Sequence, residues 1–326
     1  MGAPSAGALL ALAFPDRIAR NRGGGNGSFL LANGRAGNLD KTLALAGEPY
    51  IAVAELAGSA AQSRVLLAAP IAVTEIEALL GDQIVEGDEI GFEPSSASLR
   101  GRWARRLGAI ALAERPIPIT PSEETARRLA RGLAQLGLDR LPWSKALTQW
   151  RDRVNFLRRH EGDEWPDLSD AVLAAGASDW LVPVLTGKTA LAQLEADEFA
   201  NAVHGLLPWN LRRRLDVDAP THFEAPSGSR VPIEYATEEG PKLAIRVQEL
   251  FGLDRHPTVA GGRVPLVIEL LSPAQRPVQI TRDLPAFWRG SYAAVRTEMR
   301  GRYPKHPWPD DPLAAPATAR AKPRGA

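Results

Sequence analysis

One strand pattern indicates how the first third of the chain folds: Ser98-Leu99-Arg100-Gly101-Arg102-Trp103-Ala104-Arg105-Arg106-Leu107. Successive side chains of a strand point to opposite faces of its sheet. One face therefore carries Arg100, Arg102 and Arg106, and the other carries Leu99, Trp103 and Leu107, while Arg105 breaks the alternation. Such a basic face suits a nucleic-acid backbone, and it equally suits an antiparallel sheet that turns one face to water.

The elements on either side of this strand predict a small β-barrel. A helical spacing lies over Val73–Leu80. Further strand-like runs are Ser28–Ala32, Tyr50–Leu56, Arg64–Ala69, Gln83–Phe92 and Ala109–Ala113. Three strands, a helix and then further strands match the element order of an OB-fold, which is a small, partly open barrel. We expect an OB-fold-like domain over residues 21–118.

A helical domain is predicted over residues 119–216. It follows a proline-rich linker, Glu114–Pro121. The start of its first helix is well marked, because Thr120 can cap it, Pro121 suits the first helical position and Glu123 completes a capping box.

A small α+β domain is predicted over residues 217–313. Its expected strands are Val231–Tyr235, Leu243–Val247, Val264–Leu271 and Val278–Thr281, and its last helix is Asp283–Arg302. The Ala/Pro/basic tail 314–326 is expected to be disordered. The expected fold class is multi-domain α+β: an OB-fold-like β-barrel, then a mainly helical domain, then a small α+β C-terminal domain.

The predicted helix Asp283–Arg302 is amphipathic. Trp288 belongs to its apolar side, which we expect to pack. Arg289, Arg296 and Arg300 lie along another side. This basic stripe suits phosphates or an acidic partner, although a solvated face is the simpler interpretation.

Composition excludes several classes of protein. The 326 residues contain no cysteine and carry a net charge of +1. Disulfides and zinc ribbons are therefore excluded, and any affinity for nucleic acid must come from local clusters. No stretch approaches the ~20 apolar residues of a membrane span. We expect no membrane partner and a cytoplasmic location.

Three motifs resemble catalytic or cofactor sites without completing them. Gly187-Lys188-Thr189 lacks the earlier glycine of a phosphate loop, since Val182 stands there. The glycine-rich segment Arg22–Gly27 precedes a strand, whereas a dinucleotide loop opens a helix. His160-Glu161 begins a zinc motif, but Glu164 takes the place of its second histidine. We therefore predict no catalytic residue, no metal site and no cofactor in this chain.

The most distinctive sequence motifs lie near the end of the chain. They are Phe287-Trp288-Arg289-Gly290-Ser291-Tyr292 and Gly301-Arg302-Tyr303-Pro304-Lys305-His306-Pro307-Trp308-Pro309-Asp310-Asp311-Pro312. Closely spaced prolines favour an extended backbone. We expect Tyr303–Pro309 to form a strap across the body, with Tyr303 and Trp308 as buried anchors.

These strings resemble the closing signature of bacterial HrpB-type helicases, a DEAH-box-like family of superfamily 2. Upstream, Gln248–Leu253, Gly261–Leu266 and Leu271-Ser272-Pro273 fit the same family. Residues 1–20 resemble the end of its helicase-associated ratchet domain, and Leu30–Arg35 resembles its OB-fold entry.

The resemblance implies a helicase that uses ATP and Mg²⁺, with RecA-like motor domains before this region. The phosphate loop, the acidic box and the arginine fingers of such a motor are not found in this sequence. We therefore expect the chain alone to be inactive as an ATPase. Its expected partners are single-stranded RNA or DNA, and helicase motor domains in cis or in trans.

Two functions from different classes remain open at this point. One is an accessory module that binds single-stranded nucleic acid, and the other is a protein-interaction scaffold that docks on a motor without touching nucleic acid. The candidate nucleic-acid-binding residues are Arg35, Arg100, Arg102, Arg106, Arg289, Arg296 and Arg300.

Overall fold

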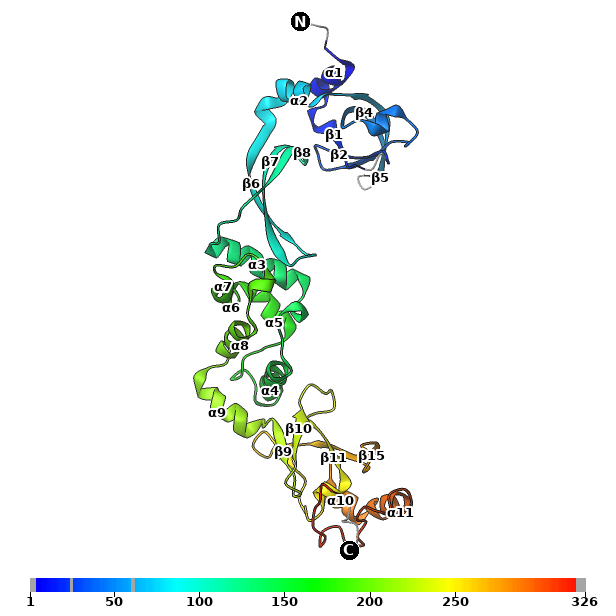
Figure 1. The fold of residues 1–326 in the computed structure, drawn as a ribbon, viewed down its shortest axis with the longest axis vertical. Coiled ribbons are helices and arrows are strands. Elements are labelled where there is room, and N and C mark those ends of the chain that lie inside the picture. Colours follow the sequence, from blue (N-terminus) through cyan, green and yellow to red (C-terminus); the bar gives the residue numbers. More distant parts are fainter. Residues whose placement is uncertain (1–3, 24–25, 60–61, 321–326) are drawn as a thin grey trace. The chain divides into compact units, whose positions relative to one another are not determined.

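The computed structural model describes residues 4–23, 26–59 and 62–320 (Figure 1). It divides into two compact units, Met1–Leu129 and Ala130–Ala326, which we call the N-terminal and C-terminal units. Strands and helices occur in both, so the fold is mixed α+β as predicted. Within the described residues, no helix is both long and apolar enough to cross a bilayer.

A closed β-barrel forms the first part of the N-terminal unit. Its strands are β1 (Ile18–Asn21), β2 (Ser28–Leu31), β3 (Ala36–Asn38), β4 (Tyr50–Ser59) and β5 (Gln62–Pro70). They follow the order β1-β2-β3-β5-β4, and β4 pairs back onto β1. Only β3 and β5 run parallel among these pairs. The interior is filled by Phe29, Leu31, Ile51, Val53 and Val65, which are all buried.

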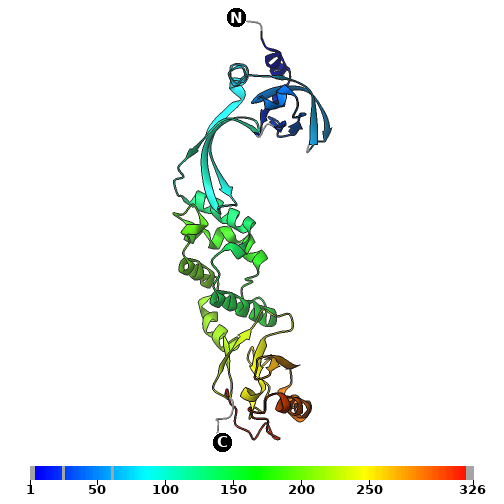
Figure 2. The same ribbon diagram turned by 45° about the vertical axis from the view of Figure 1, so that its right-hand side comes forward.

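The predicted barrel membership is wrong for the strands after the helix α2 (Val73–Leu80). The strands β6 (Ile84–Glu93), β7 (Ser98–Leu107) and β8 (Ile110–Ile117) form a separate antiparallel sheet beside the barrel, which Figure 2 shows as long, curved ribbons. The reason lies in the strand Ile18–Asn21, whose first three residues fall in the segment 1–20 that the resemblance assigns to the end of the ratchet domain. This segment pairs with both β2 and β4, so the barrel closes without β6–β8.

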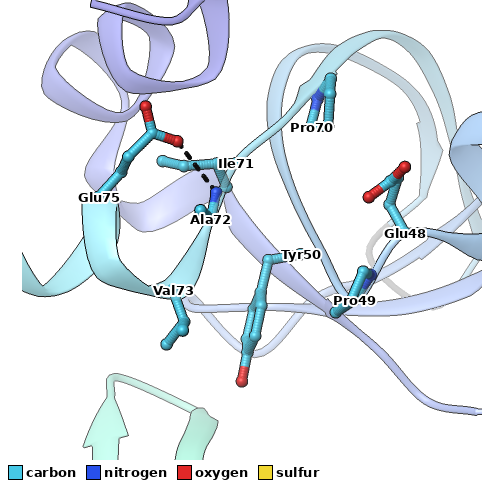
Figure 3. A pocket seen from close by; sticks show the side chains of 8 residues that line it. All are labelled: Glu48, Pro49, Tyr50, Pro70, Ile71, Ala72, Val73 and Glu75. Atoms are coloured by element: carbon cyan, nitrogen blue, oxygen red, sulfur yellow. Dashed lines mark hydrogen bonds between the residues drawn. The ribbon is translucent and has the colours of Figure 1, made fainter.

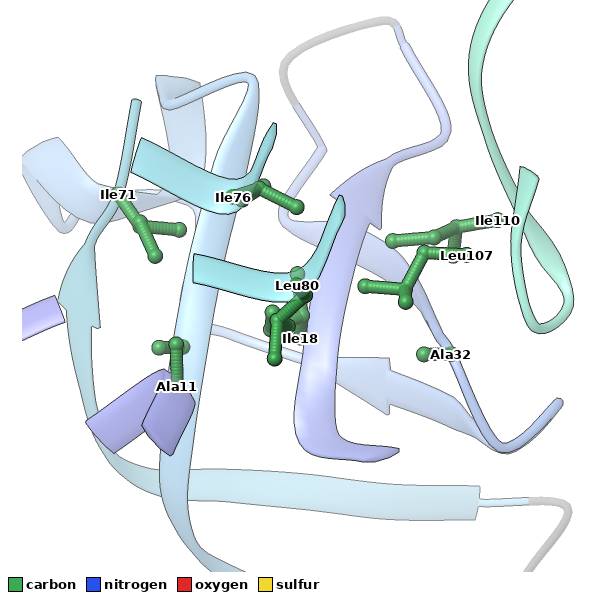
Figure 4. Packing of buried hydrophobic residues seen from close by; sticks show 9 residues of the cluster. Ala11, Ile18, Ala32, Ile71, Ile76, Leu80, Leu107 and Ile110 are labelled. Atoms are coloured by element: carbon green, nitrogen blue, oxygen red, sulfur yellow. The ribbon is translucent and has the colours of Figure 1, made fainter. Parts of the chain in front are cut away.

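A second core joins this sheet to the barrel (Figure 4). Ile18 and Ala32 of the barrel pack with Leu107 and Ile110 of the sheet. The helices α1 (Ala6–Ala13) and α2 cover the same cluster. The N-terminal helical segment therefore packs into the core that joins the barrel to the sheet.

Helices dominate the next part of the chain. The first, α3 (Glu123–Leu136), runs across the boundary between the units, and its cap differs from the prediction. Ser122 accepts a hydrogen bond from Thr125 N (3.2 Å) and donates its own N–H to Thr125 Oγ1 (2.8 Å), so Ser122 takes the role assigned to Thr120. The others are α4 (Lys145–Glu161), α5 (Asp170–Ala175), α6 (Ala177–Trp180), α7 (Val182–Leu185), α8 (Ala196–Gly205) and α9 (Trp209–Asp218).

A five-stranded sheet follows in the order β15-β14-β11-β10-β9. Its strands are β9 (His222–Glu224), β10 (Arg230–Glu234), β11 (Lys242–Arg246), β14 (Val267–Leu271) and β15 (Pro277–Thr281). The predicted strand Val264–Leu271 is divided, because Val264–Pro265 (β13) pairs with Thr258–Val259 (β12) instead. At the break, Leu266 donates its N–H to Pro257 O (3.0 Å) rather than to the large sheet.

The predicted helix Asp283–Arg302 is also divided. Gly290 ends α10 (Leu284–Arg289) by donating its N–H to Ala286 O (2.9 Å), and α11 (Tyr292–Arg302) starts anew. Beyond it, the strap buries Trp308 but leaves Tyr303 half-exposed, so Tyr303 is not a buried anchor.

The tail was expected to be disordered over 314–326. Thr318 donates its N–H to Gln248 O (3.0 Å), so the tail contacts the unit at this residue. Residues 321–326 lie outside the described residues.

Candidate nucleic-acid interface

A cleft opens in the N-terminal unit between the barrel and the turn that joins β7 to β8. It is lined by Arg20, Asn21, Arg22 and Leu30 from the barrel side, and by Arg102, Arg106, Ala109, Ile110, Ala111 and Glu114 from the sheet side. Four of these residues are arginines and one is a carboxylate. The lining is therefore basic, although the chain as a whole is close to neutral.

The β7–β8 turn is fixed to the barrel by two hydrogen bonds. Ala109 donates its N–H to Ala32 O (2.8 Å), and Tyr50 Oη donates to Leu112 O (3.4 Å). Gly108 has a φ of +54°, and a Cβ added to it would lie 2.2 Å from Ala32 O. A glycine at this position lets the two parts approach and so gives the cleft its second wall.

Arg106 is held by carboxylates inside the cleft. Its Nε and Nη2 donate to the two oxygens of Glu89 (2.5 and 2.9 Å), and Nη2 also lies 3.2 Å from Glu114 Oε1. These hydrogen bonds lower the pKa of Glu89 and raise that of Arg106. The N–H donors of the Arg106 guanidinium are already used by these carboxylates. Arg106 is therefore better suited to holding the wall of the cleft in place than to binding a phosphate.

Arg102 and Arg22 remain more available for a ligand. The side chain of Arg102 is 47% exposed and lies 3.7 Å from Glu114, a distance at which an ion pair contributes little. Arg22 is exposed and Arg20 is half-buried. Neither of these two forms an ion pair within the part of the chain that the structure describes.

The structure therefore brings only some of the predicted residues together. Arg102 and Arg106 line the cleft, whereas Arg100 is exposed on the same strand outside it. Arg35 lies on the barrel with Nη2 at 3.4 Å from Ser63 Oγ, away from the cleft lining. Sequence reasoning missed Arg20 and Arg22. Arg20 lies in β1 and Arg22 directly follows the end of that strand, so only their spacing of two residues next to a glycine-rich segment could have identified them.

Arg105, which broke the alternation, has a structural role. Its guanidinium lies 2.7 Å from Glu77 on α2 and 2.6 Å from Glu86 on β6. It therefore ties the helix to the sheet on the face opposite the cleft.

The basic stripe predicted near the C-terminus is interrupted. Arg289 is exposed on α10, and Arg300 is exposed on α11. Arg296 donates its Nε to Trp308 O (3.2 Å) and pairs with Asp310, so it holds the strap in place. Because the helix divides at Gly290, the three arginines do not form one continuous stripe.

A second hollow in the N-terminal unit is more apolar. Figure 3 shows Tyr50, Pro49, Pro70 and Val73 around it, with Glu75 bound to the backbone N–H of Ala72 (3.0 Å). Partial burial raises the pKa of Tyr50. The hollow brings together no set of groups suited to catalysis.

Two of the incomplete motifs, those that contain Lys188 and Glu161, have structural roles. The segment before Gly187 is the helix α7, and Lys188 Nζ lies 3.1 Å from Glu198 Oε1. Glu161 is bound by Arg214 Nη2 (2.7 Å), Arg263 and Trp165 Nε1 (2.8 Å). Among the described residues, no cluster of histidine and acidic side chains has the geometry to hold a metal ion.

Comparisons with known proteins agree with the resemblance found in the sequence. Residues 180–312 match the family model HrpB_C, described as "ATP-dependent helicase C-terminal". The chain is 40% identical over 318 residues to the ATP-dependent RNA helicase HrpB of Escherichia coli (strain K12), covering 96% of this chain and 39% of that protein.

Two crystal structures are also similar. One, of the E. coli DExH-box NTPase HrpB, matches 97% of this chain and 39% of its own at 40% identity, with a TM-score of 0.59. The other, of the Escherichia coli DEAH/RHA helicase HrpB, matches 92% and 38% at 37% identity, with a TM-score of 0.52. The chain thus spans 39% of the length of the curated relative that it matches.

Proposed function

Because the chain corresponds to the C-terminal portion of HrpB-type ATP-dependent helicases, we propose that it is the nucleic-acid-binding accessory region of such a helicase. It binds single-stranded RNA or DNA, packs against helicase motor domains in cis or in trans, and has no ATPase activity of its own. ATP and Mg²⁺ belong to the motor domains and not to this region.

The basic cleft is the observation that carries this proposal. Its exposed guanidinium groups, Arg22 and Arg102, stand on opposite walls, one on the barrel side and one on β7. The barrel order β1-β2-β3-β5-β4 supports an OB-fold-like barrel, a fold that binds oligonucleotides. Guanidinium groups pair with phosphates and stack on bases. A single strand in the cleft would meet both walls at once.

Reversing both exposed charges should weaken binding of single strands. We expect Arg22→Glu/Arg102→Glu to lose most of the affinity for a short labelled oligonucleotide at low salt, measured by fluorescence anisotropy. The salt slope should fall by about 1.4, because each phosphate contact on a single strand contributes ~0.7. Arg106 is left intact in this variant, since a glutamate there would face Glu89 and Glu114.

A matched control reverses two exposed arginines elsewhere. Arg230→Glu/Arg255→Glu makes the same change in net charge at side chains that are 67% and 91% exposed. An equal loss of affinity in the two variants would mean that binding depends only on the overall charge. The cleft would then not be the binding site. No binding by the parent chain would favour the alternative function, a scaffold that docks on a motor without contacting nucleic acid.

The second expected result is an absence of ATP turnover. The purified chain should show no ATPase above background, with or without RNA, because phosphoryl transfer needs positioned phosphates and metal. Lys188 is already paired with Glu198. A release of phosphate that survives purification and disappears in Lys188→Ala would contradict the proposal.

A further inference from the structure

An indole stands out on the surface of the C-terminal unit. Trp209, the first residue of α9, is 80% exposed, the largest exposed fraction of any large hydrophobic residue in the described chain. Exposing an indole to water is unfavourable. Trp and Arg are also the residue types most often found at the energetic centres of binding surfaces. The exposure leaves the indole free to contact a ligand.

The helix that carries Trp209 is firmly held. Leu211 and Leu215 of α9 are both buried. At its C-terminal end, the buried Arg153 donates to Leu215 O (3.1 Å) and Ala219 O (2.5 Å). With the opposite side of α9 fixed in the core, the indole is presented on a rigid support rather than on a mobile loop.

The surroundings of the indole are basic. The Cζ of Arg212 lies 5.1 Å from the centroid of the Trp209 ring, in cation–π geometry. Arg213 follows four residues after Trp209, so it is a neighbour on the helix surface, and it is exposed. The first turn of α9 contains no acidic residue. Farther along, Asp216 pairs with Arg153 and Asp218 with Arg214.

We propose that Trp209, Arg212 and Arg213 form a stacking platform for a base of single-stranded nucleic acid. This inference rests on the proposed function and adds a contact in the other unit, separate from the basic cleft. An exposed indole stacks on the π-face of any base, and the adjacent guanidinium groups meet the phosphates on either side. The residues beside the indole favour a phosphate-bearing ligand, because Asn210 is polar and Arg212 and Arg213 are cations that no acidic residue of the first turn offsets.

The test compares two oligonucleotides of the same length, oligouridylate and an abasic strand, by fluorescence anisotropy at low salt. For oligouridylate, Trp209→Ala should bind roughly 5- to 100-fold more weakly with an unchanged salt slope, and Trp209→Phe should keep most of the affinity. For the abasic strand, Trp209→Ala should bind like the parent chain, because no base is present to stack. Arg213→Glu should lower the salt slope with both strands.

The outcomes separate this inference from the function on which it rests. If Trp209→Ala binds oligouridylate like the parent while Arg22→Glu/Arg102→Glu does not, the platform is wrong and the cleft proposal stands. If the parent binds neither strand, both proposals fail. If Trp209→Ala changes the sedimentation of the free chain but not its binding, Trp209 is a protein contact and the platform is overturned. Val85→Ala, at another exposed apolar side chain (71%), is the control for nonspecific effects.

Discussion

Replacing Trp308 with alanine is expected to lower the free energy of unfolding of the C-terminal unit by about 3–5 kcal/mol, as buried Trp→Ala changes do. The Trp308 side chain is buried, and its Nε1 donates to Tyr303 O (3.0 Å). Its backbone carbonyl accepts from Arg296 Nε (3.2 Å). The substitution therefore removes the apolar packing of the indole. It also removes the hydrogen bond between Trp308 Nε1 and Tyr303 O, which holds the strap against the unit. Thermal unfolding should shift downward by on the order of 10 °C.

Trp209→Ala is the matched control for this measurement. It removes the same side chain from a position that is 80% exposed, so the unfolding temperature should barely change. A protease provides the second measurement. If cleavage before residue 303 occurs readily in the parent chain and costs no stability, the strap is a free tail and the expected role of Trp308 is wrong.

Much of the local structure could be predicted because it depends on neighbours in sequence. The helix α2 matches its predicted bounds, since the spacing of Ile76 and Leu80 alone places both in the core. The strand β7 likewise follows from its alternation. Trp308 was expected to be buried from its aromatic, proline-flanked context, and it is.

Barrel membership depends on pairing between distant segments, which no local pattern encodes. Ile18–Asn21 is only four residues long and its first two residues, Ile18 and Ala19, are both fully buried, so it shows no alternation. Its pairing with β2 and β4 nevertheless closes the barrel. Once this strand is in place, the run containing Arg102 must belong to another sheet.

The candidate site was only partly predictable for a related reason. Whether an arginine is available depends on the register of its strand. Arg106 lies opposite Val85, yet its side chain reaches along the sheet to Glu89. The sequence contains both residues but not the register that lets them meet. The arginine stripe predicted near the C-terminus could not be judged from sequence for the same reason. Arg296 contacts Trp308 and Asp310 only once the strap has folded.

Both the fold of the N-terminal unit and the geometry of the cleft depend on the absence of a Cβ at Gly108. Its φ of +54° is in the left-handed region, and a Cβ there would lie 2.2 Å from Ala32 O and 3.1 Å from Ala32 C. A left-handed conformation costs an L-residue roughly 1–2 kcal/mol, and forcing extra atoms into packed structure costs about 1–3 kcal/mol. Gly108→Ala should therefore destabilise the N-terminal unit by about 2–5 kcal/mol.

The movement that relieves this clash makes the substitution informative about function as well. To relieve the clash, the β7–β8 turn must move away from Ala32, which breaks the hydrogen bond from Ala109 N and separates Leu107 and Ile110 from Ile18. The cleft would lose the geometry that sets Arg102 opposite Arg22. We expect Gly108→Ala to weaken oligonucleotide binding even at temperatures where the variant is folded.

Gly87→Ala is the control for the Gly108 substitution. Gly87 lies in β6, the strand next to β7, its φ is not positive, and a Cβ there would meet nothing within 4 Å. Alanine should be neutral or slightly stabilising at this position, because glycine in a strand loses more conformational freedom on folding. Denaturant unfolding of the three proteins gives the comparison. A Gly108→Ala variant as stable as Gly87→Ala, with oligonucleotide binding unchanged, would show that the turn does not dock on Ala32 as described and that the cleft needs no such wall.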